Sequence, residues 1–218
     1  MFTGIIEAVG ELAAITWQGS DARLHIRSRQ LDLNDVRLGD SIAVNGVCLT
    51  VVTLHADGFI ADASRETLTL TTLGRLPLQS PLNLEKALTP TTRLGGHLVS
   101  GHVDGIAKIR SRKDDGRSLH LELEAPPALA HYIAPKGSVC LDGTSLTVNR
   151  VNAHYFTVNI VPHTQTGTII PGYRIGTEVN LEVDLIARYL ERLLQGQQPA
   201  PHKDISTAFL AAHGFFKT

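Results

Sequence analysis

The chain has 218 residues, of which 43% are hydrophobic and 19% are charged, so it is long enough to bury two small cores. Lys and Arg total 20 against 21 for Asp and Glu, and this balance excludes the basic surface typical of proteins that bind nucleic acid or anionic membranes. We expect no nucleic-acid partner and no membrane partner. The first residues, MFTGIIEAVGEL, contain neither a basic segment nor a long apolar run, so a cytoplasmic protein with reduced Cys48 and Cys140 is expected.

Short β-rich segments separated by turns dominate both halves of the chain. In the first half they cover residues 4–15, 22–28, 41–46, 48–54 and 59–64, and in the second half residues 102–109, 118–125, 138–143, 145–151 and 155–161. Many short strands at close spacing favour a sandwich or a closed barrel, and closure removes exposed strand edges. We therefore predict an all-β fold of two small antiparallel barrels.

The pattern changes to a helix after the second set of strands. Apolar residues fall at helical spacing at Leu185, Ile186, Tyr189, Leu190, Leu193 and Leu194. Asp184 can cap the start of this helix and Gly196 its end. The helix either packs on its own barrel or packs on copies of itself in an oligomer, and the wide apolar stripe favours the oligomer. Residues 197–203 are expected to be a linker, and residues 204–218 a short helix with exposed Phe side chains and no assigned role.

An internal repeat relates the two halves. Residues 45–52 are NGVCLTVV and residues 142–149 are DGTSLTVN, so Cys48 and Ser145 lie 97 positions apart. The same offset relates Thr3-Gly4 to Ser100-Gly101, Thr67 to Thr164, and Asn83-Leu84-Glu85 to Asn180-Leu181-Glu182. This period is too long for a solenoid unit, so each copy is expected to be a domain. We predict domains at residues 1–97 and 98–195, the second including the helix, and a tail at residues 196–218.

Seven segments together resemble the riboflavin synthases of the alpha-chain type, which have a duplicated lumazine-binding barrel. They are MFTGII, NGVCLTV, SRETL, GGHLVSGHVDG, DGTSLTVN, VPHT and VNLEVDLIARYLERLL. The resemblance implies two six-stranded Greek-key barrels followed by a helix that forms a homotrimer. It also implies dismutation of two molecules of 6,7-dimethyl-8-ribityllumazine to riboflavin and 5-amino-6-ribitylaminopyrimidinedione, the last step of riboflavin biosynthesis. The chain departs from the family pattern in the loop after Thr164, TQTGTIIPGYRIG.

In this family no added cofactor is used, and each site combines the first barrel of one subunit with the second barrel of a neighbour. The sequence makes no prediction about association with lumazine synthase. By residue matching, the first half-site would use Gly4, Ile5, Ile6, Cys48, Leu49, Thr50, Asp62, Ala63, Ser64, Arg65, Glu66, Thr67, Gly101, His102 and Val103. The second would use Lys136, Ser145, Leu146, Thr147, Asn159, Ile160, Val161, Pro162, His163 and Thr164. Strand N–H and C=O groups suit the alternating donors and acceptors of a flat heteroaromatic ring.

The implied chemistry needs a base that removes a proton from the 7-methyl group and a nucleophile or water that activates the acceptor ring. The catalytic candidates are Cys48, His102, Ser145 and Thr147, and His102 has the side chain whose ordinary pKa is nearest neutrality. Each has a structural alternative, because Cys48 can be a small buried hydrophobe and His102 can complete a turn. Asp142 and Asp184 are expected to orient partners. His97 and His102 have no third ligand at metal-site spacing, so no metal is expected.

Two other function classes remain open at this stage. A non-catalytic lumazine- or flavin-binding protein of the antenna type would need only one intact half-site, and the four reactive candidates favour the enzyme over it. The barrel domain of a flavin-dependent reductase would need a nucleotide-binding domain with a Gly-rich turn, and the remaining residues contain none. A transferase that moves a four-carbon unit between two lumazines would explain why two similar half-sites carry unequal residues.

Overall fold

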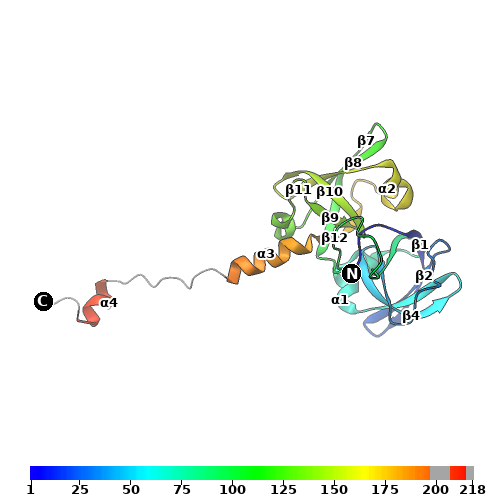
Figure 1. Cartoon of the computed structure of the whole chain (residues 1–218), viewed down its shortest axis with the longest axis horizontal. Helices are drawn as coiled ribbons and strands as arrows, with labels where there is room; N and C mark the ends of the chain where they lie inside the picture. Colours follow the sequence, from blue (N-terminus) through cyan, green and yellow to red (C-terminus); the bar gives the residue numbers. More distant parts are fainter. Residues whose placement is uncertain (197–206, 215–218) are drawn as a thin grey trace. The chain divides into compact units, whose positions relative to one another are not determined.

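The computed structural model describes residues 1–196 and 207–214. It divides into one compact unit of residues 1–188 and a second of residues 189–218, and each is described by itself (Figure 1). The first unit contains two closed antiparallel barrels of six strands each, and the chain continues into a helix. The predicted all-β fold with a C-terminal helix is therefore confirmed. The expected linker at residues 197–203 lies outside the described residues.

The first barrel has the strand order β1-β2-β5-β4-β3-β6, in which non-consecutive strands are neighbours as in a Greek key. Its strands are β1 (Ala8–Gln18), β2 (Asp21–Arg27), β3 (Ser41–Val44), β4 (Val47–His55), β5 (Gly58–Ala63) and β6 (Pro81–Lys86). β1 pairs with β6, which closes the barrel and leaves neither strand as an open edge.

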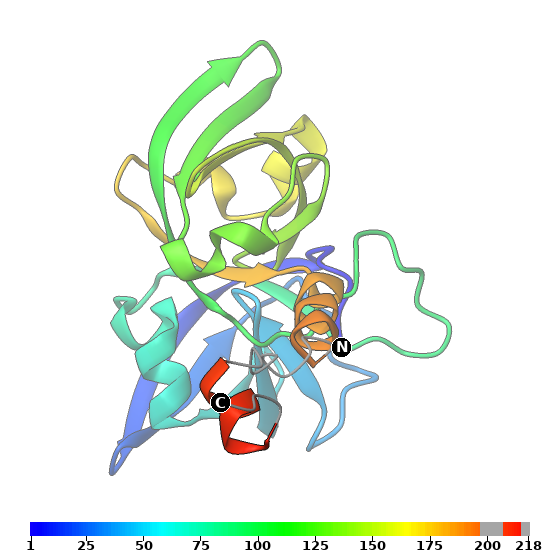
Figure 2. The same cartoon turned by 90° about the vertical axis from the view of Figure 1, so that its left-hand side faces the viewer.

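The second barrel repeats this order with the equivalent strands, because β7-β8-β11-β10-β9-β12 runs around a closed ring. Its strands are β7 (Gly105–Asp115), β8 (Ser118–Glu124), β9 (Ser138–Leu141), β10 (Thr144–Asn152), β11 (Tyr155–Ile160) and β12 (Glu178–Val183). Figure 2 shows the second barrel, in green to yellow, stacked on the first, in blue to cyan. Each barrel has its own hydrophobic core.

The repeated NG and DG dipeptides form the tight hairpin turns between β3 and β4 and between β9 and β10. Asn45 and Gly46 have φ values of 46° and 77°, and Asp142 and Gly143 have φ values of 41° and 82°. Two successive residues with positive φ are what a two-residue hairpin of type I′ requires, which explains Asn or Asp followed by Gly. The two turns also meet, because a Cβ added to Gly46 would lie 2.6 Å from the backbone nitrogen of Gly143.

Reciprocal hydrogen bonds join the two barrels. The side-chain amide of Asn83 donates to the carbonyl oxygen of Asp142 at 2.8 Å, and that of Asn180 donates to the carbonyl oxygen of Asn45 at 2.8 Å. The donors and the acceptors are repeat equivalents, so the barrels are related by a local two-fold axis. Phe2 pairs with its own equivalent, Val99, across that axis.

Short helices complete each barrel. α1 (Arg65–Leu70) and the 3-10 helix η1 (Thr72–Arg75) follow β5, and η2 (Pro127–Tyr132), α2 (Pro162–Gly167) and η3 (Ile170–Gly172) lie in the second barrel. Ser64 caps α1, since its hydroxyl accepts a hydrogen bond from the Thr67 backbone N–H at 3.2 Å.

The predicted helix after the second barrel is α3 (Leu185–Gly196). Asp184 Oδ1 accepts a hydrogen bond from the Ile186 N–H at 3.0 Å, which confirms the predicted cap. The apolar side chains along α3 are exposed in the single chain, including Tyr189 and Leu193, each at 64%. In the tail, α4 (Thr207–Ala212) carries an exposed Phe209. Among the described residues, no helix is long and apolar enough to cross a membrane.

Candidate functional site

Two extended segments cross from one barrel to the other and meet the repeated Cys48 and Ser145. The carbonyl oxygen of Gly4 accepts a hydrogen bond from the Ser145 N–H at 2.7 Å, and that of Gly101 accepts one from the Cys48 N–H at 2.8 Å. Gly4, Ile5 and Ile6 therefore lie beside the second barrel, whereas Gly101 lies beside the first. The resemblance assigned Gly4, Ile5 and Ile6 to the first half-site, whereas the structure places them beside residues of the second.

The crossing segments approach so closely that only glycine fits. Gly4 has a φ of 75°, and a Cβ built on it would lie 2.6 Å from the Cβ of Ser145. Gly101 has a φ of 81°, and its Cβ would lie 2.6 Å from the Cβ of Cys48. Real Cβ atoms do not approach other atoms this closely, so the positions of Ser145 and Cys48 require glycine at residues 4 and 101.

The predicted first half-site is an exposed strip on β4, β5 and α1. Thr50 lies opposite Asp62 in the sheet, and both are exposed. Asp62 pairs with Arg23 Nε at 3.0 Å. Further along the strip, the structure places Ser64, Arg65 and Glu66 exposed, Thr67 partly buried, and Leu49 and Ala63 in the core. The buried members can therefore offer a ligand only their backbone groups.

The predicted second half-site is built in the same way, and it contains a cavity of about 90 Å³. It is lined by Gly4, Ile5, Ile6, Thr144, Ser145, His163, Thr164, Gly167 and Thr168. Nearby, Thr147, Val161 and Lys136 are exposed, Asn159 and Pro162 are partly buried, and Leu146 and Ile160 are buried. Ligand pockets usually enclose about 300–1,000 Å³, so this cavity of a single chain is too small to enclose such a ligand.

Ser145 has a histidine partner that the sequence analysis did not identify. His97 Nδ1 lies 2.6 Å from Ser145 Oγ, within hydrogen-bond distance. Burial lowers the pKa of His97 below its ordinary value, and the negative charge of Asp184 acts in the opposite direction. A neutral imidazole next to a hydroxyl is the arrangement in which a base can activate a nucleophile. By contrast, the His102 side chain is exposed, and its backbone N–H donates to Ser100 Oγ at 3.2 Å.

Asp142, expected as an orienting residue, lies in the interface between the barrels. Its carboxyl accepts hydrogen bonds from Tyr173 Oη at 2.6 Å and from the Asn180 N–H at 2.8 Å. Burial raises the pKa of Asp142 from 3.8 to about 7, against the opposing effect of these hydrogen bonds. The equivalent Asn45 is neutral, and its side-chain oxygen accepts from the Asn83 N–H at 2.7 Å.

Comparison with known proteins identifies the family. The lumazine binding domain matches residues 3–87 and again residues 100–184. The chain is 48% identical to the riboflavin synthase of Photobacterium phosphoreum over 216 residues, which cover 99% of each chain. It is 39% identical to the riboflavin synthase of Bacillus subtilis (strain 168) over 216 residues, covering 99% of this chain and 100% of the relative. This chain belongs to the riboflavin synthase family.

Solved structures support the fold of this family member. A crystal structure of LumP complexed with 6,7-dimethyl-8-(1'-D-ribityl) lumazine superposes with a TM-score of 0.76 at 23% identity, covering 84% of this chain and 99% of that one. LumP complexed with riboflavin gives a TM-score of 0.78. At this identity the likeness concerns the double-barrel fold alone.

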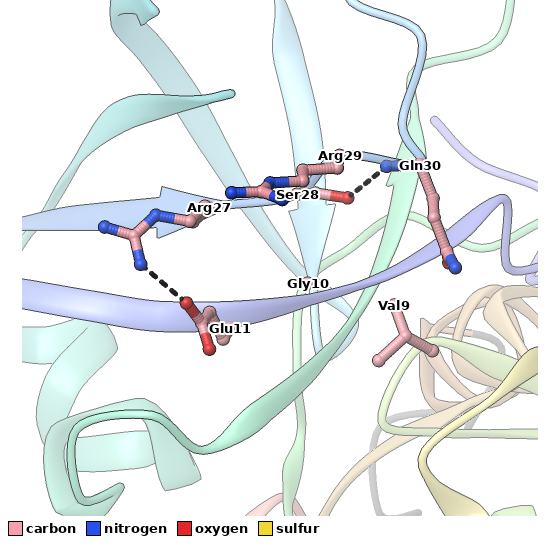
Figure 3. A pocket seen from close by; sticks show the side chains of 7 residues that line it. All are labelled: Val9, Gly10, Glu11, Arg27, Ser28, Arg29 and Gln30. Carbon is pink, nitrogen blue, oxygen red and sulfur yellow. Dashed lines mark hydrogen bonds and ion pairs between the residues drawn. The ribbon is translucent and has the colours of Figure 1, made fainter. Parts of the chain in front are cut away.

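A larger open pocket of about 350 Å³ lies on the first barrel of this family member, and none of the four catalytic candidates lines it. Figure 3 shows that Arg27 points toward Glu11 along its wall, and the two side chains form a hydrogen bond of 2.8 Å. The other lining residues are Val9, Gly10, Ser28, Arg29 and Gln30. None belongs to the predicted half-sites. Among the described residues, no group of three or more His, Cys, Asp or Glu side chains could hold a metal ion.

Proposed function

We propose that this protein is a riboflavin synthase that dismutates two molecules of 6,7-dimethyl-8-ribityllumazine. One molecule donates a four-carbon unit and becomes 5-amino-6-ribitylaminopyrimidinedione, while the other accepts the unit and becomes riboflavin. The observation that carries this proposal is the duplicated half-site, in which equal backbone geometry at Cys48 and Ser145 presents unequal side chains. Two related sites suit a reaction of two identical molecules with different roles, and correct orientation of such partners supplies much of the rate.

In this proposal Ser145 and His97 act on the acceptor lumazine. The hydroxyl of Ser145 would add to C7 of the ring while His97 Nδ1 takes the hydroxyl proton, and their 2.6 Å separation supports this pairing. Thr147 lies two residues after Ser145 on β10, and its hydroxyl would form a hydrogen bond with the ring. His102 is exposed and would contact the ligand from the crossing segment beside Cys48. The reaction itself would need no cofactor.

We further propose that the active form is a cytoplasmic homotrimer in which the first barrel of one subunit faces the second barrel of a neighbour. Two observations support assembly. The second half-site encloses only about 90 Å³ in one chain, and the apolar face of α3 is exposed, with Leu193 at 64%. An exposed apolar stripe of this kind indicates a protein interface.

The test of the reaction is to incubate the purified protein with the lumazine alone. Riboflavin and the pyrimidinedione should appear in a ratio of one to one, measured by chromatography. A non-catalytic antenna-type protein would bind the lumazine and leave it unchanged. The enzyme is favoured over that alternative because full-length identity to riboflavin synthases reaches 48%, whereas identity to LumP is 23%.

The test of assembly uses two substitutions on the apolar face of α3, Leu190→Glu and Leu193→Glu. We expect the double variant to sediment as a monomer that binds the lumazine weakly and does not convert it, because charges on an apolar interface prevent association. Gln195→Glu, on the opposite side of the helix by helical geometry, is the control and should leave the assembly intact. A chain truncated after Asp184 should behave like the double variant. Full activity in a monomer would contradict the intersubunit site.

A further inference from the structure

Two buried carboxylates lie outside the set of predicted site residues, one in each barrel. Glu85 on β6 is 3% exposed and Glu182 on β12 is 4% exposed. They are repeat equivalents within the NLE motif. Burial raises the pKa of both carboxyls, and a buried carboxylate is costly unless hydrogen bonds compensate for the lost water. The partners of these groups therefore indicate their role.

Glu85 binds the N-terminal crossing segment with both oxygens. Its Oε1 accepts hydrogen bonds from the Thr3 backbone N–H at 2.7 Å and from the Thr3 hydroxyl at 2.6 Å. Its Oε2 accepts one from the Gly4 N–H at 3.0 Å. The Thr3 hydroxyl in turn accepts from the Ile5 N–H at 3.1 Å. Hydrogen bonds to a charged acceptor are about twice as strong as neutral ones, so this segment is held firmly.

Glu182 binds the second crossing segment in the same way. Its Oε1 accepts hydrogen bonds from the Ser100 N–H at 2.6 Å and from the Ser100 hydroxyl at 2.7 Å, and its Oε2 accepts one from the Gly101 N–H at 3.0 Å. The Ser100 hydroxyl accepts from the His102 N–H at 3.2 Å. We call each carboxylate with the two residues that it binds a clamp: Glu85 with Thr3-Gly4, and Glu182 with Ser100-Gly101. The two clamps have the same hydrogen bonds, although Ser100 takes the place of Thr3.

Each clamp acts on the barrel to which its carboxylate does not belong. Glu85 is in the first barrel, but the Gly4 that it holds accepts the hydrogen bond of Ser145 in the second barrel. Glu182 is in the second barrel, but the Gly101 that it holds accepts the hydrogen bond of Cys48 in the first. In both cases one glycine residue links the two hydrogen bonds, because its N–H donates to the carboxylate and its C=O accepts from the N–H of Ser145 or Cys48.

We propose that Glu85 and Glu182 are positioning residues that act across the barrels: each binds the N–H of the glycine whose carbonyl places the reactive residue of the opposite half-site. Neither carboxylate contacts the reactive side chain, so each acts through the crossing segment. The kinetic consequence rests on the proposed riboflavin synthase function, whereas the structural consequence does not. Each half-site therefore depends on a carboxylate of the other barrel. Loss of that carboxylate in one barrel should displace Ser145 or Cys48 in the other.

The first test is amide hydrogen exchange at Ser145 and Cys48 in the full chain, measured by NMR for Glu85→Gln and Glu182→Gln. Glutamine keeps one acceptor oxygen and turns an NH₂ donor toward an N–H donor, so at least one clamp bond is lost. Glu85→Gln should speed exchange at Ser145 about ten-fold or more and leave Cys48 unchanged. Glu182→Gln should show the opposite pattern. Equal changes at both amides in both variants, or no change, would overturn the proposal.

A control variant separates the clamp from general effects on the crossing segment. Glu7 Oε1 accepts a hydrogen bond from the Lys86 N–H at 2.9 Å, and Glu7 is exposed. Glu7→Gln should leave both amides unchanged. If Glu85→Gln does not fold, Thr3→Val and Ser100→Ala each remove one hydroxyl bond to the clamp carboxylate and should show the same crossed pattern with smaller changes. Uniform exchange in these variants would also overturn the proposal.

The second test is steady-state kinetics on the same variants. Glu85→Gln should lower kcat about ten-fold or more with KM within about two-fold of the wild type, because misplacing Ser145 affects the transition state more than binding. A rise in KM alone would contradict a positioning role. A wild-type protein that makes no riboflavin would contradict the proposed function but not the crossed exchange pattern. If the wild type makes riboflavin but the Glu85→Gln and Glu182→Gln variants do not show the crossed pattern of amide exchange, only the proposed positioning role is contradicted.

Discussion

The two half-sites have nearly the same backbone and different side-chain neighbours. The N–H groups of Cys48 and Ser145 donate to glycine carbonyls at 2.8 and 2.7 Å, respectively. Yet Ser145 has His97 beside its hydroxyl, whereas Cys48 packs with an apolar cluster between the barrels. The duplication therefore supplies equal geometry, and substitutions at a few positions supply different chemistry. Breaking the shared geometry should affect stability and activity most, and exchanging single side chains should affect them least.

The largest effect is expected from removing the shared geometry with Gly4→Ala. A non-glycine residue at a φ of 75° costs about 1–2 kcal/mol, and overpacking against Ser145 adds about 1–3 kcal/mol. We expect a loss of about 2–5 kcal/mol in the free energy of unfolding, measured by urea titration, together with loss of turnover. Gly19 has a φ of 66° and open space around its Cβ position, so Gly19→Ala should show the strain alone. Equal losses in both variants would contradict the close approach.

The next effect concerns Asp142 against the neutral Asn45. The folded pKa of Asp142 is raised to about 7 from 3.8, so between these values the folded protein keeps a proton that the unfolded chain releases. The contribution of Asp142 to the free energy of unfolding should therefore be fully present below about pH 4. It should fall as pH rises to about 7, at up to about 1.4 kcal/mol per pH unit. Asp142→Asn should remove this slope and stabilise the protein at about pH 8, in urea titrations across the range.

Asn45→Asp provides the mirror-image control for that experiment. It should introduce a similar fall in stability with rising pH, because it places a second carboxyl in the buried interface. A wild-type protein whose stability rises between about pH 5 and pH 7 would contradict the raised pKa of Asp142.

A third effect concerns the Ser145–His97 pair. Loss of one hydrogen bond to a charge that develops in the transition state costs about 1.5–3 kcal/mol, so Ser145→Ala should lower kcat by about ten-fold to over a hundred-fold with little change in ligand affinity. His97→Gln should have a similar effect. The double variant should be no slower than the slower single variant, because the two groups act together. Additive losses in steady-state kinetics would show that they act separately.

The sequence predicted the duplicated barrels well because the repeat is direct and its turns have strong local signals. The Asn45-Gly46 and Asp142-Gly143 dipeptides specify two-residue hairpins from backbone preference alone. Strands β6 and β12 were not apparent as strands, since four or five successive residues of each are buried and the alternating pattern is absent. Helices α1 and α2 have six residues each, too few for a helical period to show.

The site was predicted less completely, because its key contacts connect distant residues. His97 lies 48 positions from Ser145, in a segment without periodic pattern, and only its fold places it at the hydroxyl. The crossing of Gly4 to the second barrel is likewise a tertiary feature. Matching residues to the family placed Gly4 and Cys48 in one half-site, although the structure places Gly4 beside Ser145 of the other copy. The signal that could have shown this is the paired Thr3-Gly4 and Ser100-Gly101 motifs, which must serve equivalent sites.

The smallest effect is expected from Cys48→Ser, which makes the first half-site match the second at this position. The side chain is partly buried beside Phe2 and Val99, and a hydroxyl of similar size should cost at most about 1 kcal/mol there. Turnover should fall by less than about five-fold, since no histidine of the described residues hydrogen-bonds Cys48 as His97 does Ser145. Steady-state kinetics and lumazine titration of Cys48→Ser beside Ser145→Ala measure the difference. If both variants show equal and small losses, the pair is structural, and the reactive groups must then be sought at His102 and Thr147.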